Sequence, residues 1–191
     1  MIELPKIILA SASPRRAEIL RAVGWPFETL PVSIDEVRSE NEDPAAYVTR
    51  LAREKAEAAA QRAQQKTIVA ADTTVALDQH ILEKPIDAQD ARRMLHLLNN
   101  RWHQVLTGMA VIDGRTSAMK VAHETTDVKF AAMSDDEIDW YVDTGDPMDK
   151  AGGYGIQGPG SRFIEGVRGD YFNVVGLPLR LLYELMKEGV R

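Results

Sequence analysis

The sequence predicts an α/β protein built on a mixed sheet, and three observations support this fold class. Ile7 to Ala10 form a continuous apolar run, as expected of a strand buried on both faces, and helix signals follow at once. Segments with strand and helix periodicity alternate in the first half of the chain. The second half is richer in strands, and its hairpin signal speaks against a purely parallel, doubly wound sheet.

Capping residues and apolar stripes predict the helices of the first half. Ser13 suits the N-cap of a first helix, with Pro14 at its first position and Gly24 at its end. Asp43-Pro44 opens a second helix by the same logic. The inner stripe of that helix comprises Tyr47, Val48, Leu51, Ala52, Lys55, Ala56 and Ala59.

The middle of the chain predicts a strand, a helix and a hairpin. Thr67 to Ala71 is an apolar run that reads as a buried strand ending at Asp72, and Asp87 is placed to cap a third helix. From Trp102 onward the pattern becomes β. The expected hairpin has Asp113-Gly114 at its turn, between strands over Val105–Ile112 and Val121–Phe130.

The last third predicts two helices separated by a glycine-rich loop and a strand. Ser134 and Glu137 form a capping box for a helix that Gly145 ends. The glycine-rich loop covers residues 152–160, a strand follows over Phe163–Val167, and a final helix begins after Pro178. The loop matches neither the P-loop nor the dinucleotide-binding fingerprint.

Composition limits the classes of function. A chain of 191 residues, 45% of them hydrophobic, can bury a sizeable core and fits one domain, residues 1–191, or two small lobes sharing one sheet. No apolar run approaches the roughly 20 residues of a membrane helix, no cysteine is present, and we expect a cytoplasmic location. A net charge of −6 argues against a general nucleic-acid surface but allows a small anionic substrate.

Ser11 to Arg16 form the first candidate site, at the junction of the first strand and helix. Free N–H groups at a helix start favour anions, and two serine hydroxyls and two guanidiniums are added there. Arg15 and Arg16 project about 100° apart, so they cannot do identical jobs. The alternative is a capped helix with solvated arginines.

Lys55 and Asp72 are the next candidates. Lys55 falls on the apolar stripe of its helix, so it either snorkels at the edge or points into a substrate cleft. Asp72 follows an apolar strand, where open α/β sheets place ligands, although a turn residue would look the same. Asp35-Glu36 and Glu83-Lys84-Pro85 are further charged groups at the ends of apolar runs.

Six segments, taken together and in order, resemble the Maf family of nucleotide pyrophosphatases over nearly the whole chain. They are Ser11 to Arg16, Asp35-Glu36, Ala71-Asp72-Thr73, Glu83-Lys84-Pro85, Lys150 to Gly158 and Asn173 to Pro178. The resemblance implies a fold similar to inosine triphosphate pyrophosphatase: an elongated mixed sheet with flanking helices, in two lobes around a central cleft. It also implies hydrolysis of a nucleoside triphosphate to the monophosphate and pyrophosphate, a divalent cation (Mg²⁺ or Mn²⁺) and a homodimer.

The resemblance also implies roles for individual residues. Asp72 would accept the proton of the attacking water, with Lys55 and Lys84 beside the triphosphate. Ser11, Ser13, Arg16 and Glu83 would bind substrate, and Glu36 and Asp72 would hold the metal. A carboxylate on Mg²⁺ is a poorer base, so whether Asp72 removes the proton or holds the water stays open.

Three positions distinguish subfamilies. Arg15, Thr73 and Gln157 match the branch that acts on dTTP and UTP, in which an amide such as that of Gln157 suits the imide edge of thymine or uracil. The branch that acts on 7-methyl-GTP usually has Trp and Glu at the first and third positions. Asp170 departs from the Ser of many relatives. Two alternative functions stay open: a 7-methyl-GTP pyrophosphatase, or a non-catalytic nucleotide-binding regulator of cell division.

Overall fold

The computed structural model describes residues 4–40, 42–78 and 80–187 of the chain. Within these ranges seven strands form one mixed sheet in the order β2-β1-β3-β5-β6-β7, with β4 paired to β3 beside this path. The strands are β1 (Ile7–Leu9), β2 (Phe27–Thr29), β3 (Ile68–Leu77), β4 (His80–Leu82), β5 (Trp102–Ile112), β6 (Met119–Phe130) and β7 (Ile164–Arg168). The predicted mixed α/β fold is confirmed.

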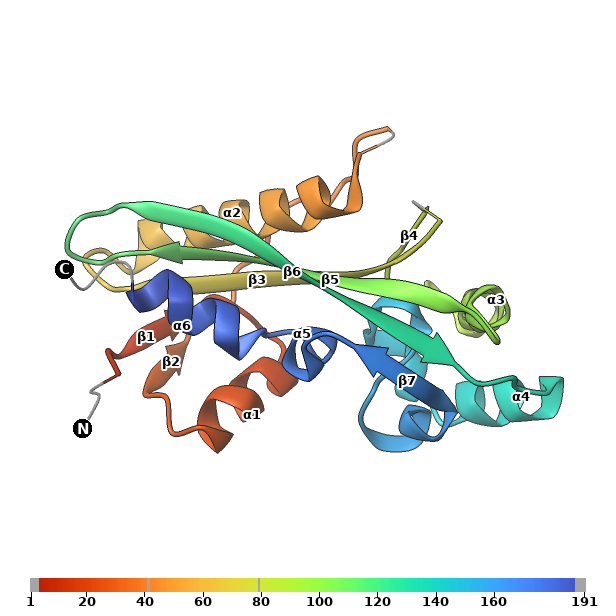
Figure 1. Cartoon of the computed structure of the whole chain (residues 1–191). Coiled ribbons are helices and arrows are strands. Elements are labelled where there is room, and N and C mark those ends of the chain that lie inside the picture. The colour runs from red at the N-terminus through yellow and green to blue at the C-terminus, as the bar shows by residue number, and fades with distance from the viewer. Residues whose placement is uncertain (1–3, 41, 79, 188–191) are drawn as a thin grey trace.

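Helices cover both faces of this sheet (Figure 1). α2 lies along one face of β3 and β5, whereas α1, α5 and α6 lie on the other. α3 and α4 pack together at the far end of the long strands. The helices are α1 (Pro14–Ala22), α2 (Pro44–Arg62), α3 (Ala88–Leu98), α4 (Asp135–Asp143), α5 (Tyr171–Val175) and α6 (Leu179–Lys187).

Most predicted helix ends are confirmed. The Asp43 side chain accepts the N–H groups of Ala45 and Ala46, and Asp87 accepts that of Asp90. The capping box of Ser134 and Glu137 is present in both directions. Ser13 does occupy the N-cap of α1, but its side chain makes no capping hydrogen bond. Its hydroxyl is therefore not needed to hold the helix end.

The strand after Thr67 is longer than predicted. β3 runs through Asp72 to Leu77 and pairs with β5 in unbroken antiparallel register from Ile68 to Ala76. The β-branched residues Thr73, Thr74 and Val75 continue the extended conformation where the polar side chains suggested a turn. Asp72 consequently lies in the middle of a strand and not at its end.

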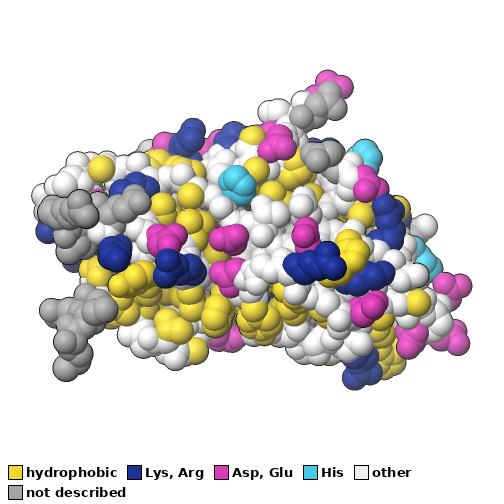
Figure 2. All heavy atoms as spheres, viewed as in Figure 1, with side chains coloured by type: hydrophobic (Ala, Val, Ile, Leu, Met, Phe, Trp, Pro, Cys, Tyr) yellow, Lys and Arg dark blue, Asp and Glu magenta, His cyan; other side chains and the backbone are white. Residues whose placement is uncertain are grey.

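Charged side chains are mixed in sign on the face shown in Figure 2, where basic and acidic groups alternate among hydrophobic patches. This face shows no basic stripe of the kind that binds a nucleic-acid backbone. Among the residues described, no helix is long and apolar enough to cross a membrane.

Candidate active site

A cleft of about 570 Å³ opens beside β3, between α1, α2 and the segment that follows α4. This segment consists of short 3₁₀ turns over Asp146–Asp149, Ala151–Gly153 and Gly158–Phe163. The cleft is lined by every predicted site residue, namely Ser11, Ser13, Arg15, Arg16, Glu36, Lys55, Asp72, Thr73, Glu83, Lys84 and Gln157. The structure therefore brings together residues that lie more than a hundred positions apart in the sequence.

Lys55 and Asp72 form the centre of one wall. The Lys55 Nζ atom lies 2.6 Å from Asp72 Oδ1 and 2.6 Å from Glu36 Oε1. The side chains of Lys55 and Asp72 are only 13% and 12% exposed, whereas that of Glu36 is 50% exposed. Lys55 thus points into the cleft and is not a snorkelling side chain. We call Lys55, Asp72 and Glu36 the Lys55 cluster.

Gly108 on β5 allows α2 to approach this closely. Gly108 pairs directly with Asp72, and a Cβ atom on it would lie 2.2 Å from the carbonyl oxygen of Val48. Only a residue without a side chain leaves room for the α2 backbone at this point. Because Lys55 follows Val48 by about two helical turns on the same stripe, this contact places its ammonium beside Asp72. The role of Gly108 could not be predicted from the sequence, since an isolated glycine in a strand carries no such specific signal.

Tyr47 connects the same helix to Glu83. Its hydroxyl donates a hydrogen bond to the Glu83 carboxylate and lies 3.2 Å from the Glu36 carbonyl oxygen. Burial, followed by the Glu83 carboxylate, raises the pKa of Tyr47, so the hydroxyl keeps its proton at neutral pH. Tyr47 was predicted as a core residue of the stripe, and its contact with Glu83 was missed. Lys84, next to Glu83, is exposed and forms no ion pair with the described residues.

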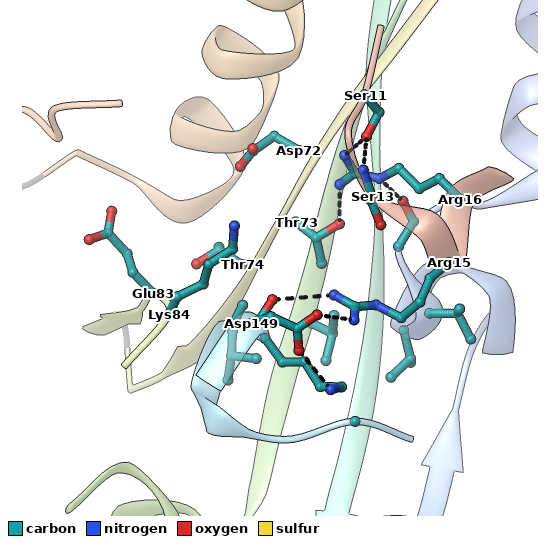
Figure 3. Close-up of a pocket in the computed structure, with 18 of the residues that line it drawn as sticks. Ser11, Ser13, Arg15, Arg16, Asp72, Thr73, Thr74, Glu83, Lys84 and Asp149 are labelled. Atoms are coloured by element: carbon teal, nitrogen blue, oxygen red, sulfur yellow. Dashed lines mark hydrogen bonds and ion pairs between the residues drawn. The ribbon is translucent and has the colours of Figure 1, made fainter. Parts of the chain in front are cut away.

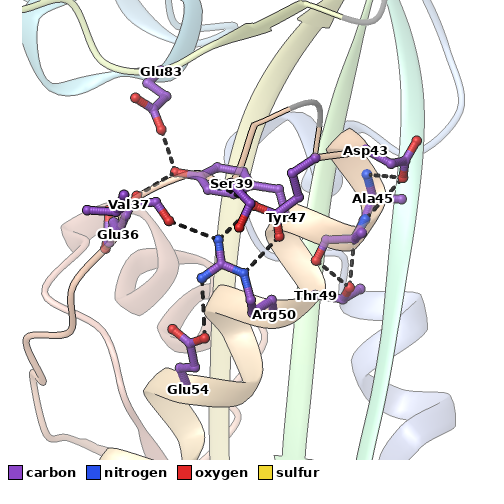
Figure 4. A network of polar contacts seen from close by, with 12 residues as sticks. Glu36, Val37, Ser39, Asp43, Ala45, Tyr47, Thr49, Arg50, Glu54 and Glu83 are labelled. Atoms are coloured by element: carbon purple, nitrogen blue, oxygen red, sulfur yellow. Dashed lines mark hydrogen bonds and ion pairs between the residues drawn. The ribbon is translucent and has the colours of Figure 1, made fainter.

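Arg50 holds the loop that carries Glu36 against α2 (Figure 4). Its Nε and Nη2 atoms each lie 2.8 Å from one oxygen of Glu42, and Nη2 also donates to the Val37 carbonyl at 3.1 Å. This two-point contact suits the planar guanidinium. Arg50 therefore restrains the Glu36 loop without entering the cleft, and sequence reasoning had not singled it out.

Arg16 extends from the first turn of α1 toward Ser11 and Thr73, and most of its hydrogen-bond donors are already used (Figure 3). Nε donates to the Gly176 carbonyl at 2.7 Å, and Nη1 donates to the Ala71 carbonyl at 2.7 Å and to Ser11 Oγ at 3.1 Å. Nη2 donates to Thr73 Oγ1 at 3.1 Å. We call these five residues the Arg16 cluster. A guanidinium has five N–H groups, so one remains for a ligand.

Arg15 points across the cleft, away from Arg16. Its Nη1 lies 2.7 Å from Asp149 Oδ2 and its Nη2 lies 3.3 Å from the Asp149 carbonyl oxygen. The two adjacent arginines therefore point in different directions and contact different partners, as their spacing on a helix predicts. Gln157 lies on the exposed part of the glycine-rich loop, at the rim of the same cleft.

The carboxylates of the Lys55 cluster are the groups that could hold a divalent cation. Among residues 4–40, 42–78 and 80–187, no three His, Asp or Glu side chains are grouped as a complete metal site. Two carboxylates do face one ammonium, which shows that a positive charge is favoured between them. Mg²⁺ is commonly bound by one or two carboxylates together with substrate phosphates, so Glu36 and Asp72 fit that requirement.

Several named proteins are similar to this chain over nearly their full length. The dTTP/UTP pyrophosphatase of Koribacter versatilis is 48% identical over 95% of this chain and 93% of its own. Those of Symbiobacterium thermophilum and Vibrio cholerae are 46% and 47% identical, covering 97% and 92% of this chain and 94% of each relative.

Two solved structures overlap more weakly, a HAM1 protein from Coxiella burnetii and the Staphylococcus aureus Ham1 protein. Each is 17% identical, with TM-scores of 0.49 and 0.47, covering 68% and 83% of this chain and 75% and 79% of the other. These values carry no argument about function. The model of the family described as Maf-like protein, in contrast, matches residues 6–189. The chain belongs to the Maf-like protein family.

Proposed function

We propose that this protein is a nucleoside triphosphate pyrophosphatase that hydrolyses dTTP and UTP to the monophosphate and pyrophosphate. The observation that carries the proposal is the meeting of the family's charged residues around one cleft, with the low-exposure pair Lys55 and Asp72 at its centre. The names of the relatives, each similar over nearly its full length, support the same substrate class.

The reaction is attack of water on the α-phosphorus. The new bond joins the water oxygen to that phosphorus, the bond to the bridging oxygen breaks, and pyrophosphate leaves with the electron pair. In this proposal Asp72 accepts the water proton, because its carboxylate lines the cleft at the centre of the charged residues gathered there. Lys84, which is exposed in the cleft and has no ion pair with a described residue, supplies positive charge for the leaving phosphates.

The serines at the start of α1 complete the phosphate site in this proposal. The side chain of Ser13 makes no capping bond, so its hydroxyl is free to contact a phosphate oxygen, and the first N–H groups of α1 favour an anion there. Ser11 also has a structural role, because its Oγ accepts hydrogen bonds from the Ser13 N–H at 3.1 Å and from Arg16. Ser11 therefore orders the turn as well as lining it.

A divalent cation, Mg²⁺ or Mn²⁺, is part of the proposal, held by Glu36 and Asp72. When bound, it would neutralise negative charge on the phosphate oxygens. The support is the donor set of these two carboxylates together with the family resemblance. A homodimer is proposed on the resemblance alone, and sedimentation of the purified protein tests it. A cytoplasmic location is proposed on the composition of the sequence.

The decisive experiment is a substrate panel. The purified protein is incubated with dTTP, UTP, 7-methyl-GTP and ITP, with Mg²⁺ or Mn²⁺, and released pyrophosphate is measured. We expect turnover of dTTP and UTP. Preference for 7-methyl-GTP would overturn the substrate assignment, and nucleotide binding without pyrophosphate release would identify a regulator instead of an enzyme.

A further inference from the structure

Asp149 takes part in a contact that connects the two walls of the cleft. It ends the 3₁₀ turn Asp146–Asp149, while its partner Arg15 belongs to the first turn of α1 (Figure 3). Arg15 contacts both the carboxylate and the main-chain carbonyl of Asp149, so the direction of the guanidinium is fixed as well as its position. This contact joins the serine-containing wall to the segment that leads into the glycine-rich loop.

The second oxygen of Asp149 is bound to Lys150. Lys150 Nζ lies 2.7 Å from Asp149 Oδ1, 3.0 Å from Asp146 Oδ1 and 2.6 Å from the Asp146 carbonyl oxygen. Burial by itself raises the pKa of Asp149, but the hydrogen bonds from Lys150 and Arg15 outweigh it and the net pKa is lowered. Asp149 is therefore ionised at neutral pH with a cation on each oxygen.

The chain of contacts continues into the loop that carries Gln157. Asp146 Oδ2 accepts the Tyr141 hydroxyl at 2.7 Å, and the same Tyr141 oxygen accepts the Gly155 N–H at 3.1 Å. The loop is tightly packed there, since a Cβ on Gly155 would lie 2.8 Å from Lys150 Cε. Gly155 is two residues before Gln157, so the contacts beginning at Arg15 end beside the loop residue expected to meet the base.

We propose that Asp149 is a positioning residue for substrate selectivity, which sets Arg15 and the Gln157 loop at a fixed separation suited to one-ring bases. The inference rests on the proposed function and adds a residue to it. Asp149 need not touch the substrate; it acts through Arg15 on one side and through Lys150 on the other. The side chains of Arg15 and Asp149 are 26% and 59% exposed, so their pairing contributes little to folding. We expect loss of the Arg15–Asp149 pair to change substrate selectivity and to leave stability almost unchanged.

The test is Asp149→Asn, which keeps the shape of the side chain and removes its charge. The matched control is Asp139→Asn on α4, an exposed aspartate that pairs with Arg92 away from the cleft. We expect the ratio of kcat/KM for dTTP and UTP to that for ATP and GTP to fall roughly tenfold, mainly through KM for the pyrimidine nucleotides. The thermal midpoint and the control should stay close to the parent.

Two further measurements separate this inference from the proposed function. Arg15→Gln combined with Asp149→Asn should lower the ratio by less than the two single changes added as free energies, because both changes break the Arg15–Asp149 contact. Hydrogen exchange of residues 150–157 without nucleotide should be faster in Asp149→Asn than in the parent and the control. An unchanged ratio or unchanged exchange overturns the inference. Absence of pyrophosphate release by the parent overturns the proposed function, and exchange then still decides whether Asp149 orders the loop.

Discussion

The Arg16 cluster and the Lys55 cluster lie beside the same cleft, yet they are built from different kinds of contact. Arg16 is held by neutral oxygen atoms of its own chain, two of them main-chain carbonyls. Lys55 is held by two carboxylates, one of which is half exposed. Carbonyl partners are fixed in place, whereas a charged partner can be exchanged for a ligand of the same charge. We infer that the Arg16 cluster maintains the shape of the cleft, whereas in the Lys55 cluster a negatively charged ligand can replace a carboxylate as the partner of Lys55.

Asp72→Asn gives the largest effect expected on the Lys55 cluster. The amide cannot accept the water proton, so pyrophosphate release should fall by roughly 10²–10⁴-fold while the fold persists. Steady-state kinetics with dTTP measure the loss, and circular dichroism measures the fold. Asp78→Asn, at an exposed turn residue directly after the strand, is the control. A purified Asp72→Asn protein with parental turnover would show that Asp72 is not the proton acceptor.

Arg16→Lys tests the other half of the comparison. An ammonium cannot reach the four acceptors that the guanidinium serves, so the free energy of unfolding should fall by on the order of 3 kcal/mol. Urea denaturation checks this value. Arg15→Lys, which alters a partly exposed ion pair, should lower it by less than about 1 kcal/mol. Equal losses in the two variants would contradict the structural role of Arg16.

A pH series tests the stability of a part of the molecule that lies outside both clusters. The group concerned is the buried His103, and neither cluster contains a histidine. Burial lowers the pKa of His103 from 6.5 to about 4, and its Nε2 lies 2.6 Å from the Tyr154 hydroxyl. The unfolded chain binds the proton more readily, so this stabilisation is complete above pH 6.5 and is lost as the pH falls toward 4. Between pH 6.5 and 5 protonation of His103 should lower the unfolding free energy of the parent by about 1.5 kcal/mol. If His103→Gln shows the same slope in that range, the loss has another source.

Tyr47→Phe gives the smallest expected effect. It removes one hydroxyl and no packing, which frees the Glu83 carboxylate beside Lys84. KM for dTTP should rise by roughly three- to tenfold with kcat little changed, because this factor corresponds to the free energy of one hydrogen bond. Tyr171→Phe, on an exposed tyrosine, is the control. A fall in kcat without a change in KM would place Tyr47 in the chemical step instead.

The sequence predicted the elements whose signals are local. Asp43, Asp87 and Ser134 cap helices as expected, because a cap involves residues a few positions apart. β2, β4 and α5 were not predicted, since elements of three to five residues are too short to show a hydrophobic periodicity. Asp113 was expected in a tight turn, but the loop extends from Asp113 to Ala118, with the Asp113 side chain accepting two main-chain N–H groups.

Long-range contacts explain what the sequence could not show at the site. The motif residues were predicted one by one, and the structure places all of them around the cleft. Their partners were not predictable: the Arg15–Asp149 contact spans 134 positions and the Arg16–Gly176 contact spans 160. No local pattern distinguishes an arginine that binds a carbonyl oxygen from one that binds phosphate.

The unbroken pairing of β3 with β5 also determines how this cleft can move. Asp72 lies within that ladder, so residues on both sides of it belong to one continuous pair of strands. A hinge at Asp72 would have to break ladder hydrogen bonds. Any widening or narrowing of the cleft must instead spread as a slight change of twist over many residues. The Asp72 carboxylate then lies where the sheet deforms least, and any change in the width of the cleft falls to the surrounding loops.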